Sequence, residues 1–434
     1  FKQKTAYEIR LSLVGSEMCI RDRPMSPISS IVLVVLALLH PANSTGQTAL
    51  PDSPVAAAPA PSAIDFTHVR ALWITRYDYK TRADVERAIA DAAGLGITDV
   101  IWQVRGQADA FYASAFEPWG EELCTPGPAG EPIPPDFDPL ATAIEAAHAR
   151  GLRLHAWLNV MPLWKGKVPP RFATHPYLAL PGLRLRDLAG EEQPLNDHYV
   201  IVNPANEDTH TYLAAVVSDL ASKYAIDGLH LDYIRFVSDT MDKSKVYPGD
   251  PATLAAFERA TGSPFARTPE GVMAYRAWLG TRITALVGAI ADALHSARPA
   301  VPLTAAVWRH PDLARDTYLQ DAPAWLHAGT LQHAFPMIYT VNDDQFRSDL
   351  DAWTAAAPAG TISPGLGTYL HPADQSPRQL DYARARGIAS TALFAYNALF
   401  DSADPNQLKT PAARAERAAR LVALAAYLKA HQTP

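Results

Sequence analysis

The chain has 434 residues, a formal net charge of −7 and 48% hydrophobic residues. This composition excludes a wholly disordered chain and supplies enough apolar side chains for one large core. The mildly acidic balance gives no basic surface for DNA or RNA, so we expect no nucleic acid partner.

The segment before Phe66 is predicted to lie outside the folded domain. Residues 1–24 contain MCIRDR, which resembles a translated sequencing adaptor rather than evolved protein. Residues 25–44 hold an apolar run that ends in small residues, as secretory signal peptides do, and this run is too short to span a membrane. Residues 45–65 are rich in Pro and Ala and predict a semi-rigid linker. We therefore expect a secreted or periplasmic protein with no stable membrane span.

From Phe66 onward, short apolar runs alternate with longer stretches of helical periodicity, which is the pattern of repeated βα units. Such a repeat predicts a (β/α)8 TIM barrel over residues 66–434, with long βα-loop insertions. A doubly wound open sheet is the alternative, but no Gly-rich loop follows its first strand. The eight predicted strands begin at Val69, Thr98, Leu152, Gly228, Pro302, His333, Thr361 and Ala389.

Long insertions follow the second, third and fourth predicted strands, at residues 113–137, 161–206 and 237–272. In barrel enzymes the loops at the carboxyl ends of the strands build the site. These insertions are rich in Pro and aromatic residues, so we expect them to form the walls of a binding groove.

Polar residues interrupt the third and fourth strands with a period of two. Trp157 and Asn159 share one face of LRLHAWLNV, and His230 and Asp232 share one face of GLHLDYIRF, while the leucines face the helices. Asn159 and Asp232 come late in their strands and should therefore lie at the barrel mouth. Asp232 is the leading candidate for chemistry, although it could instead form a structural ion pair with Arg105 or Arg235. His230 is more simply a satisfied core histidine.

The second strand leads into QVRGQADAFYASAFEPWG, where charged and aromatic residues are interleaved. Sugar rings stack on aromatic faces and their hydroxyls need polar partners, so this composition favours a carbohydrate site. Packing of the loop and a turn cap at Asp109 are the alternatives for these residues. The residues concerned are Arg105, Asp109, Phe111, Tyr112 and Trp119.

Aromatic residues recur near the ends of other predicted strands, at Tyr77, Trp157, Trp308, Tyr339, Tyr369 and Tyr396. A set of this kind around one rim predicts a carbohydrate cleft. We expect Trp157, Trp308 and Tyr339 to line one groove together with Arg105 and Asn159.

The motifs DAFYASAFEPWG, HAWLN, VNPAN, DGLHLDYIRF and PMIYT occur in this order and resemble the glycosyl-hydrolase-like 10 family of bacterial envelope proteins. The resemblance runs from about Phe66 to beyond Asn397. It implies a TIM-barrel glycosidase-type protein, in a family with members that act on peptidoglycan glycan strands. It also implies that Asp232 and Asp109 belong to the active-site face. The chain departs from many retaining barrel glycosidases in having no carboxylate at the end of PGLGTY.

A glycosidase normally needs two carboxyl groups that flank the scissile bond. Asp232 is the first choice, and we expect it to be ionised because Arg105 and Arg235 are both expected to lie near it. Its partner could be Asp109, Asp78 after the first strand, or Asp343 after the sixth strand. Asp343 could face a centre shared with Asp232, or it could belong to a helix N-terminus.

The sequence therefore favours a glycoside hydrolase that acts on an extended, cell-envelope glycan without a cofactor. A glycan-binding barrel that has lost catalysis is the second interpretation. A metal-dependent hydrolase using His155, His230 and Asp232 is the third, but no HxH or HExxH motif supports a metal. Of the two cysteines, only Cys124 falls in the predicted domain, where a free thiol is the simplest interpretation.

Overall fold

The structure is a computed structural model that describes residues 64–128, 131–237, 241–404 and 410–431. The predicted adaptor-like segment and signal peptide, and all but the end of the predicted linker, lie outside the described residues. The first element is a 3-10 helix, η1 (Phe66–His68), which leads into the first strand.

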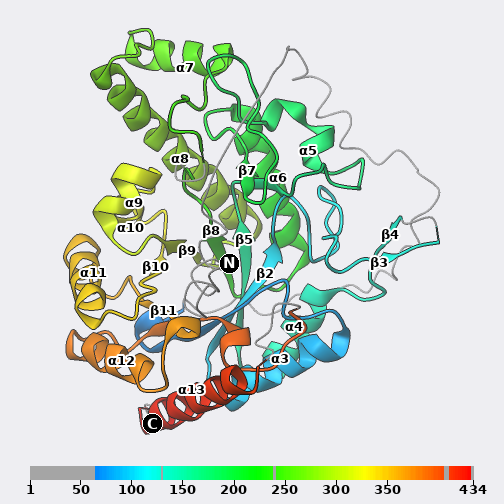
Figure 1. The fold of residues 1–434 in the computed structure, drawn as a ribbon, viewed down its shortest axis with the longest axis vertical. Coiled ribbons are helices and arrows are strands. Elements are labelled where there is room, and N and C mark those ends of the chain that lie inside the picture. Colours follow the sequence, from blue (N-terminus) through cyan, green and yellow to red (C-terminus); the bar gives the residue numbers. More distant parts are fainter. Residues whose placement is uncertain (1–63, 129–130, 238–240, 405–409, 432–434) are drawn as a thin grey trace, which may run out of the picture.

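Parallel strands form a nearly closed barrel with helices outside it (Figure 1), which confirms the predicted fold class. Their order in the sheet is β10-β9-β8-β5-β2-β1-β12-β11. Isolated parallel bridges from Ala334 to Ile362 and from Met337 to Gly365 join the two outer strands, so each strand neighbours the next around the ring. The strands are β1 (Arg70–Ile74), β2 (Asp99–Arg105), β5 (Arg153–Asn159), β8 (Gly228–Asp232), β9 (Leu303–Val307), β10 (His333–Pro336), β11 (Gly365–Gly367) and β12 (Thr391–Phe394).

Strand β8 is shorter than the apolar run that predicts it. It ends at Asp232, because Tyr233 has a φ of 50°, in the left-handed region that extended strands do not use. The predicted continuation to Phe236 is therefore wrong. As a result, Asp232 is the last residue of its strand and stands at the carboxyl end of the barrel.

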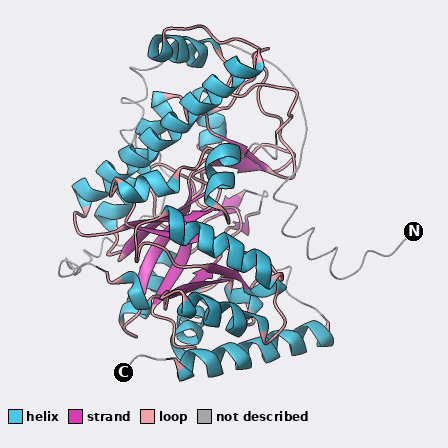
Figure 2. Cartoon of the chain, turned by 90° about the vertical axis from the view of Figure 1, so that its left-hand side faces the viewer, coloured by secondary structure: helices cyan, strands magenta, loops and turns pink. Residues whose placement is uncertain are grey.

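The barrel helices form a layer around the strands (Figure 2). Local sequence signals start several of them: Thr81 and Asp84 form a capping box at the first, and Asp138 caps the second ahead of Pro139. The helices are α3 (Arg82–Gly94), α4 (Pro139–His148), α6 (Glu207–Lys223), α8 (Pro269–Ala297), α9 (Pro311–Tyr318), α10 (Ala322–His327), α11 (Asp343–Ala356), α12 (Gln375–Ala385) and α13 (Pro411–Ala430).

Helix α8 is long and apolar enough, by length and composition alone, to cross a membrane. One of its faces is buried, with Leu279, Ile283 and Leu286 among the buried residues, and the helix packs on α6. A buried helix of a barrel layer passes the same test, so α8 is only weak support for a membrane span.

The insertions carry additional elements. The long connections after β5 and β8 are joined by Lys245, whose Nζ lies 2.5 Å from Asp187 and 2.7 Å from Glu191, with only 1% of the lysine side chain exposed. Figure 1 places their helices α5 and α7 on the same side of the barrel. The added elements are β3 (Thr125–Pro126), β4 (Pro132–Ile133), β6 (Pro162–Lys165), α5 (Pro176–Ala179), η2 (Pro181–Leu183), β7 (Tyr199–Ile201) and α7 (Pro251–Thr261).

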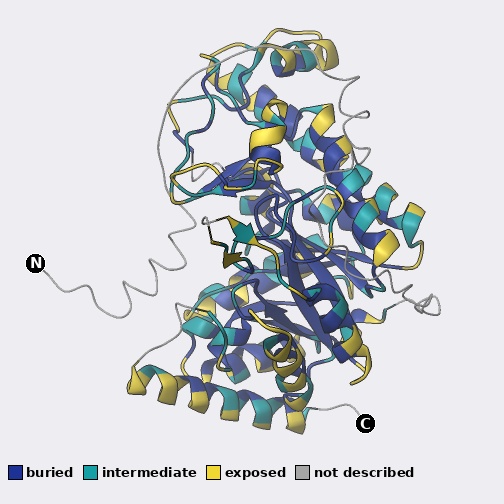
Figure 3. Ribbon diagram, turned by 90° about the vertical axis from the view of Figure 1, so that its right-hand side faces the viewer, coloured by how far each residue is buried: buried dark blue, intermediate teal, exposed yellow. Residues whose placement is uncertain are grey.

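The core has an outer and an inner part. Leu154, Leu158 and Leu229 belong to the large cluster outside the strands, whereas Trp157 belongs to a smaller cluster inside the barrel, as the alternation predicts. Phe66 closes the amino-terminal end of the barrel by stacking on His333, with 4.3 Å between ring centroids. Figure 3 shows the strands as mostly buried and the outer faces of the helices as exposed. We call the two ends of the barrel the base, where Phe66 lies, and the mouth.

Candidate active site

The mouth brings together the ends of β5 and β8. Asn159 pairs in register with Asp232, and Trp157 pairs with His230 one layer deeper. The predicted placement of these four residues inside the barrel is therefore confirmed. The layer at the mouth presents an amide and a carboxylate, and the layer beneath it presents two rings.

Oδ1 of Asp232 accepts hydrogen bonds from two neighbouring residues. This oxygen accepts from the backbone N–H of Tyr233 at 2.6 Å and from Nη1 of Arg235 at 2.9 Å, and the residue is 7% exposed. Both contacts stabilise the ionised carboxylate. The ion pair that the sequence left open thus forms with Arg235, whose guanidinium also lies 5.3 Å from the centroid of the Trp308 ring.

Half-buried aromatic rings gather beside Asp232. Tyr339 stacks on Phe394 at a centroid distance of 5.3 Å, and Tyr369 stands edge-on to both. Trp157 meets Phe394 edge to face at 6.5 Å. Burial raises the pKa of Tyr339, and the charge of Asp232 adds to this rise, which places the phenol within electrostatic reach of the carboxylate. The mouth therefore combines a carboxylate with several aromatic faces.

Tyr199 was missed by sequence reasoning, because it comes from the hairpin of the insertion after β5. Its hydroxyl lies 3.3 Å from Nη2 of Arg76 and 3.5 Å from Nδ2 of Asn159, and its ring packs edge-on against Tyr233. Asn159 in turn accepts a 3.0 Å hydrogen bond from Nε1 of Trp157. A continuous polar chain thus runs across the mouth.

Phe394 was also missed, and Tyr396 was named in its place. Tyr396 is fully buried, stacks on Phe400 and donates its hydroxyl to Asp91 at 2.6 Å. The strand ends at Phe394 and a 3-10 helix (Tyr396–Ala398) follows, so alternation no longer applies to the tyrosine. The expected place of Tyr396 in a cleft is therefore corrected.

Arg105 and Tyr112 are both buried within the protein. Nε of Arg105 lies 2.9 Å from Glu117, and Nη1 donates to the carbonyl of Val160 at 3.0 Å, with no exposed side-chain surface. It fixes the loop after β2 to the end of β5 and cannot line a groove, which corrects the expectation. Tyr112 is 1% exposed, and its ring packs edge-on against Tyr224.

His230 is a satisfied core histidine. Nε1 of Trp73 lies 3.2 Å from its Nε2, and its Nδ1 lies 2.9 Å from Oγ1 of Thr304. Burial lowers the pKa of His230, so the ring is neutral. His155 is bound to Asp99 at 2.9 Å, at the opposite end of the barrel from Asp232. Among the described residues, no group of three His, Cys, Asp or Glu side chains could hold a metal ion.

Asp109 closes the turn after β2. Its Oδ1 accepts from the backbone N–H groups of Gly106 at 3.2 Å and Gln107 at 2.8 Å, so it is a turn cap, the alternative that the sequence left open. Ala108 before it has a φ of 60°, in the left-handed region. Burial raises the pKa of Asp109 to about 7, with the nearby Glu122 carboxylate adding to the rise and Arg76 opposing it.

The other two candidate partners of Asp232 are engaged elsewhere. Asp78 is fully buried and accepts from the backbone and hydroxyl of Thr75 at 2.7 and 2.9 Å. Asp343 lies in the first turn of α11 and contacts Gln375 at 2.8 Å and Arg378 at 3.2 Å, both on α12. Burial would raise the pKa of Asp343, but these hydrogen bonds outweigh it and lower the pKa. Asp343 thus belongs to a helix N-terminus and ties two outer helices together.

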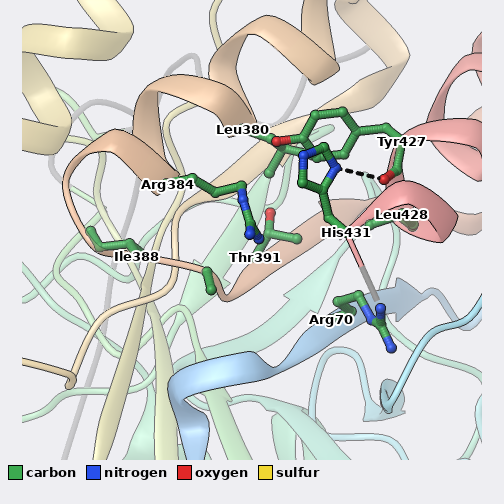
Figure 4. Close-up of a pocket in the computed structure, with 9 residues that line it drawn as sticks. Arg70, Leu380, Arg384, Ile388, Thr391, Tyr427, Leu428 and His431 are labelled. Atoms are coloured by element: carbon green, nitrogen blue, oxygen red, sulfur yellow. Dashed lines mark hydrogen bonds between the residues drawn. The ribbon is translucent and has the colours of Figure 1, made fainter. Parts of the chain in front are cut away.

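Cys124, in the loop after β2, is a half-buried free thiol, and burial raises its pKa to about 11. A small pocket lies at the base, between the starts of β1 and β12 and the end of α13 (Figure 4). Its lining includes Arg70, Arg384 and His431. This pocket is at the opposite end of the barrel from Asp232.

The chain is similar to known proteins over the part that builds this site. The sequence profile of the glycosyl hydrolase-like 10 family matches residues 68–363, which include both Asp109 and Asp232. Glycosyl hydrolase DigH of Escherichia coli K12 is 24% identical over 376 residues, covering 74% of this chain and 77% of that protein. Glycosyl hydrolase YngK of Bacillus subtilis is 24% identical over 277 residues, covering 58% of this chain and 48% of that protein.

Solved structures share the fold at low sequence identity. The PgaB (BpsB) glycoside hydrolase domain of Bordetella bronchiseptica is similar with a TM-score of 0.58 and 14% identity, covering 81% of this chain and 99% of that domain. The catalytic domain of β-amylase from Paenibacillus polymyxa gives a TM-score of 0.55 at 11% identity, covering 86% of this chain and 100% of that domain. These similarities extend over nearly the whole barrel.

Proposed function

Because this chain belongs to the glycosyl hydrolase-like 10 family and is a glycoside hydrolase of that kind, we propose that it cleaves an extended cell-envelope glycan at the mouth of its barrel. The observation that carries this proposal is the placement of Asp232 at the end of β8, beside Arg235 and a group of half-buried aromatic rings. We propose peptidoglycan, or another polysaccharide of the envelope, as the substrate. A secreted or periplasmic location goes with this substrate.

The contacts of Asp232 favour the ionised carboxylate as the form that takes part in catalysis. One oxygen is occupied by the Tyr233 amide and by Arg235, which also fixes the direction of the carboxylate. An ionised carboxylate serves a glycosidase as the nucleophile or as the base that activates water. A second carboxyl group must then supply the proton to the leaving oxygen.

The aromatic rings provide the surface on which sugar rings would stack. Tyr339, Tyr369, Phe394 and Trp308 are each partly exposed, and the buried Trp157 packs against Phe394. Several rings placed side by side suit a polymer with more than one sugar in contact with the protein. Hydrogen bonds from Asn159 and Arg235 would complement the sugar hydroxyls.

The test is Asp232→Asn, which keeps the shape and removes the charge. Asp343→Asn on α11 is the matched control, because it removes a carboxylate that is bound to Gln375 and Arg378 of α12. We expect Asp232→Asn to stay folded, to bind glycan and to lose turnover by about 10³-fold or more, whereas Asp343→Asn stays active. The assay measures release of reducing ends from peptidoglycan glycan strands, with and without stem peptides.

Retained turnover in a folded Asp232→Asn variant would contradict the assignment. An unfolded variant would instead favour the structural ion pair with Arg235.

A glycan-binding barrel without catalysis is the second candidate. The observation that favours it is that Asp109 and Asp78, two of the predicted partners of Asp232, are no more than 1% exposed. Glycan binding by the wild type without release of reducing ends from any envelope polysaccharide would select this second function.

A further inference from the structure

The loop after β2 carries a second carboxylate that the sequence analysis did not name. Nε of Arg76, at the end of β1, donates to Oε1 of Glu122 at 3.1 Å. The same guanidinium packs on Gly106, where a Cβ atom would approach Arg76 Cζ to 2.8 Å. Asp109 lies in the turn that Gly106 begins. Two carboxyl groups, those of Asp109 and Glu122, thus share one arginine.

The two members of this Asp109–Glu122 pair differ in access. Asp109 is 1% exposed, whereas 20% of the Glu122 side chain is exposed. Oε2 of Glu122 is buried and, within the described part of the chain, has no hydrogen-bond partner. Oδ2 of Asp109 is unsatisfied in the same way, so the exposed fraction alone makes Glu122 the member of the pair that a substrate can reach.

The pair is connected to Asp232 through the polar chain across the mouth. Nη2 of Arg76 lies 3.3 Å from the hydroxyl of Tyr199, which lies 3.5 Å from Nδ2 of Asn159. Asn159 is the register partner of Asp232. Glu122 is therefore linked through Arg76 and Tyr199 to Asn159, the neighbour of Asp232 in the β5–β8 ladder, with strands β2 and β5 between β1 and β8.

Resting on the proposed function, we propose that Glu122 is the second catalytic carboxyl group and that Asp109 is its positioning residue. Glu122 would give its proton to the glycosidic oxygen as the bond from that oxygen to C1 breaks, and the electron pair of the bond stays on the oxygen. Water supplies the hydroxyl group at C1, and a carboxylate takes the remaining proton. The net change is hydrolysis of one glycosidic bond.

Charged groups surround the Asp109–Glu122 pair. Arg76 faces it from β1, and Glu117 is a further carboxylate on the same loop, bound to Arg105. The Lys80 ammonium donates to the backbone carbonyl of Glu122. Burial and the Glu122 carboxylate raise the pKa of Asp109 to about 7, so Asp109 is partly protonated in neutral solution.

The deciding variant is Glu122→Gln, with Glu121→Gln as its matched control. Glu121 is the neighbouring residue, has a similar exposed fraction of 21%, and pairs with Arg171 at 2.7 Å. On natural glycan we expect Glu122→Gln to lower kcat by a factor of about 10² to 10⁴, and Glu121→Gln to leave it unchanged. On a nitrophenyl glycoside, whose leaving group needs no proton, the loss for Glu122→Gln should be much smaller. A merely structural role would lower both rates equally.

The pH–rate profile of Asp109→Asn provides the second readout. Asp109 is the member of the pair whose pKa is raised to about 7, so its removal should move the basic limb of the profile. Full activity of folded Glu122→Gln on natural glycan would overturn the inference and leave the proposed function intact. If Glu122→Gln does not fold, an unchanged basic limb in Asp109→Asn overturns it. A wild type that cleaves no glycan would overturn the proposed function itself.

Discussion

The base and the mouth of the barrel use inward-facing positions of the same strands in opposite ways. At the base, Asp99 binds His155, His333 lies 2.7 Å from Ser363, and Phe66 covers them. At the mouth, Asp232 has a protein partner, but the rings beside it are only half-buried. Burial of a polar side chain inside a barrel is therefore no sign of a site by itself. The informative feature is whether the side chains around that polar group are exposed.

The largest expected effect is the loss of stability when a buried aromatic ring is removed, and it can be compared between Phe66 at the base and Trp157 near the mouth. Phe66→Ala and Trp157→Ala each remove an aromatic side chain from the inner core, and each should lower the free energy of unfolding by about 3–5 kcal/mol. Only Trp157 contacts Phe394 and Asn159 at the mouth, so only its loss should also weaken glycan binding. Denaturant unfolding and a glycan-binding titration measure the two quantities. Equal loss of binding in both variants would contradict the division into base and mouth.

The next effect is the pH dependence of stability, which should have opposite signs at the two ends. Burial lowers the pKa of His333 to about 3. The contribution of the neutral His333 ring to the free energy of unfolding is therefore complete above the unfolded-state pKa near 6.5, and it is lost as the pH falls below that value. Burial raises the pKa of Asp109 to about 7, so the charged group destabilises the fold increasingly as pH rises from about 4 to 7.

Two variants measure these slopes. Between pH 6.5 and 4.5, the stability of the wild type relative to His333→Gln should fall by about 1.4 kcal/mol per pH unit. Asp109→Asn should gain stability relative to the wild type at pH 8 and lose this gain near pH 4. Urea unfolding at several pH values gives both curves. Parallel curves for the wild type and either variant would contradict the corresponding assignment.

The smallest expected effect concerns the turn at the mouth. Ala108 has a φ of 60°. This left-handed conformation destabilises a residue other than glycine by about 1–2 kcal/mol. Ala108→Gly should therefore raise stability by about 1 kcal/mol, as thermal unfolding would show. Gly106→Ala is the matched change with the opposite sign, because its Cβ would press on Arg76. A loss of stability in Ala108→Gly would mean that this backbone conformation carries no strain.

Period-two alternation predicted the inward residues of β5 and β8, because a strand fixes the face of every second side chain. It failed at Tyr396, where the chain leaves the strand for a 3-10 helix. Arg105 and Arg235 were indistinguishable as partners for Asp232, since Glu117, which binds Arg105, comes from an insertion. Tyr199 and Glu122 were missed for the same reason. Their partners are distant in sequence, and no local pattern marks such contacts.

The position of Phe66 at the base determines how the protein can be attached to other objects. Helix α13 also ends at the base, where its residue Tyr427 and the following His431 line the same pocket as Arg70 of β1. A bead, fluorophore or carrier protein joined before Phe66 or after α13 would therefore sit behind the barrel and leave the mouth facing the medium. The nearness of these two ends also makes the barrel suited to circular permutation, with a short linker across the base and new termini in an outer loop.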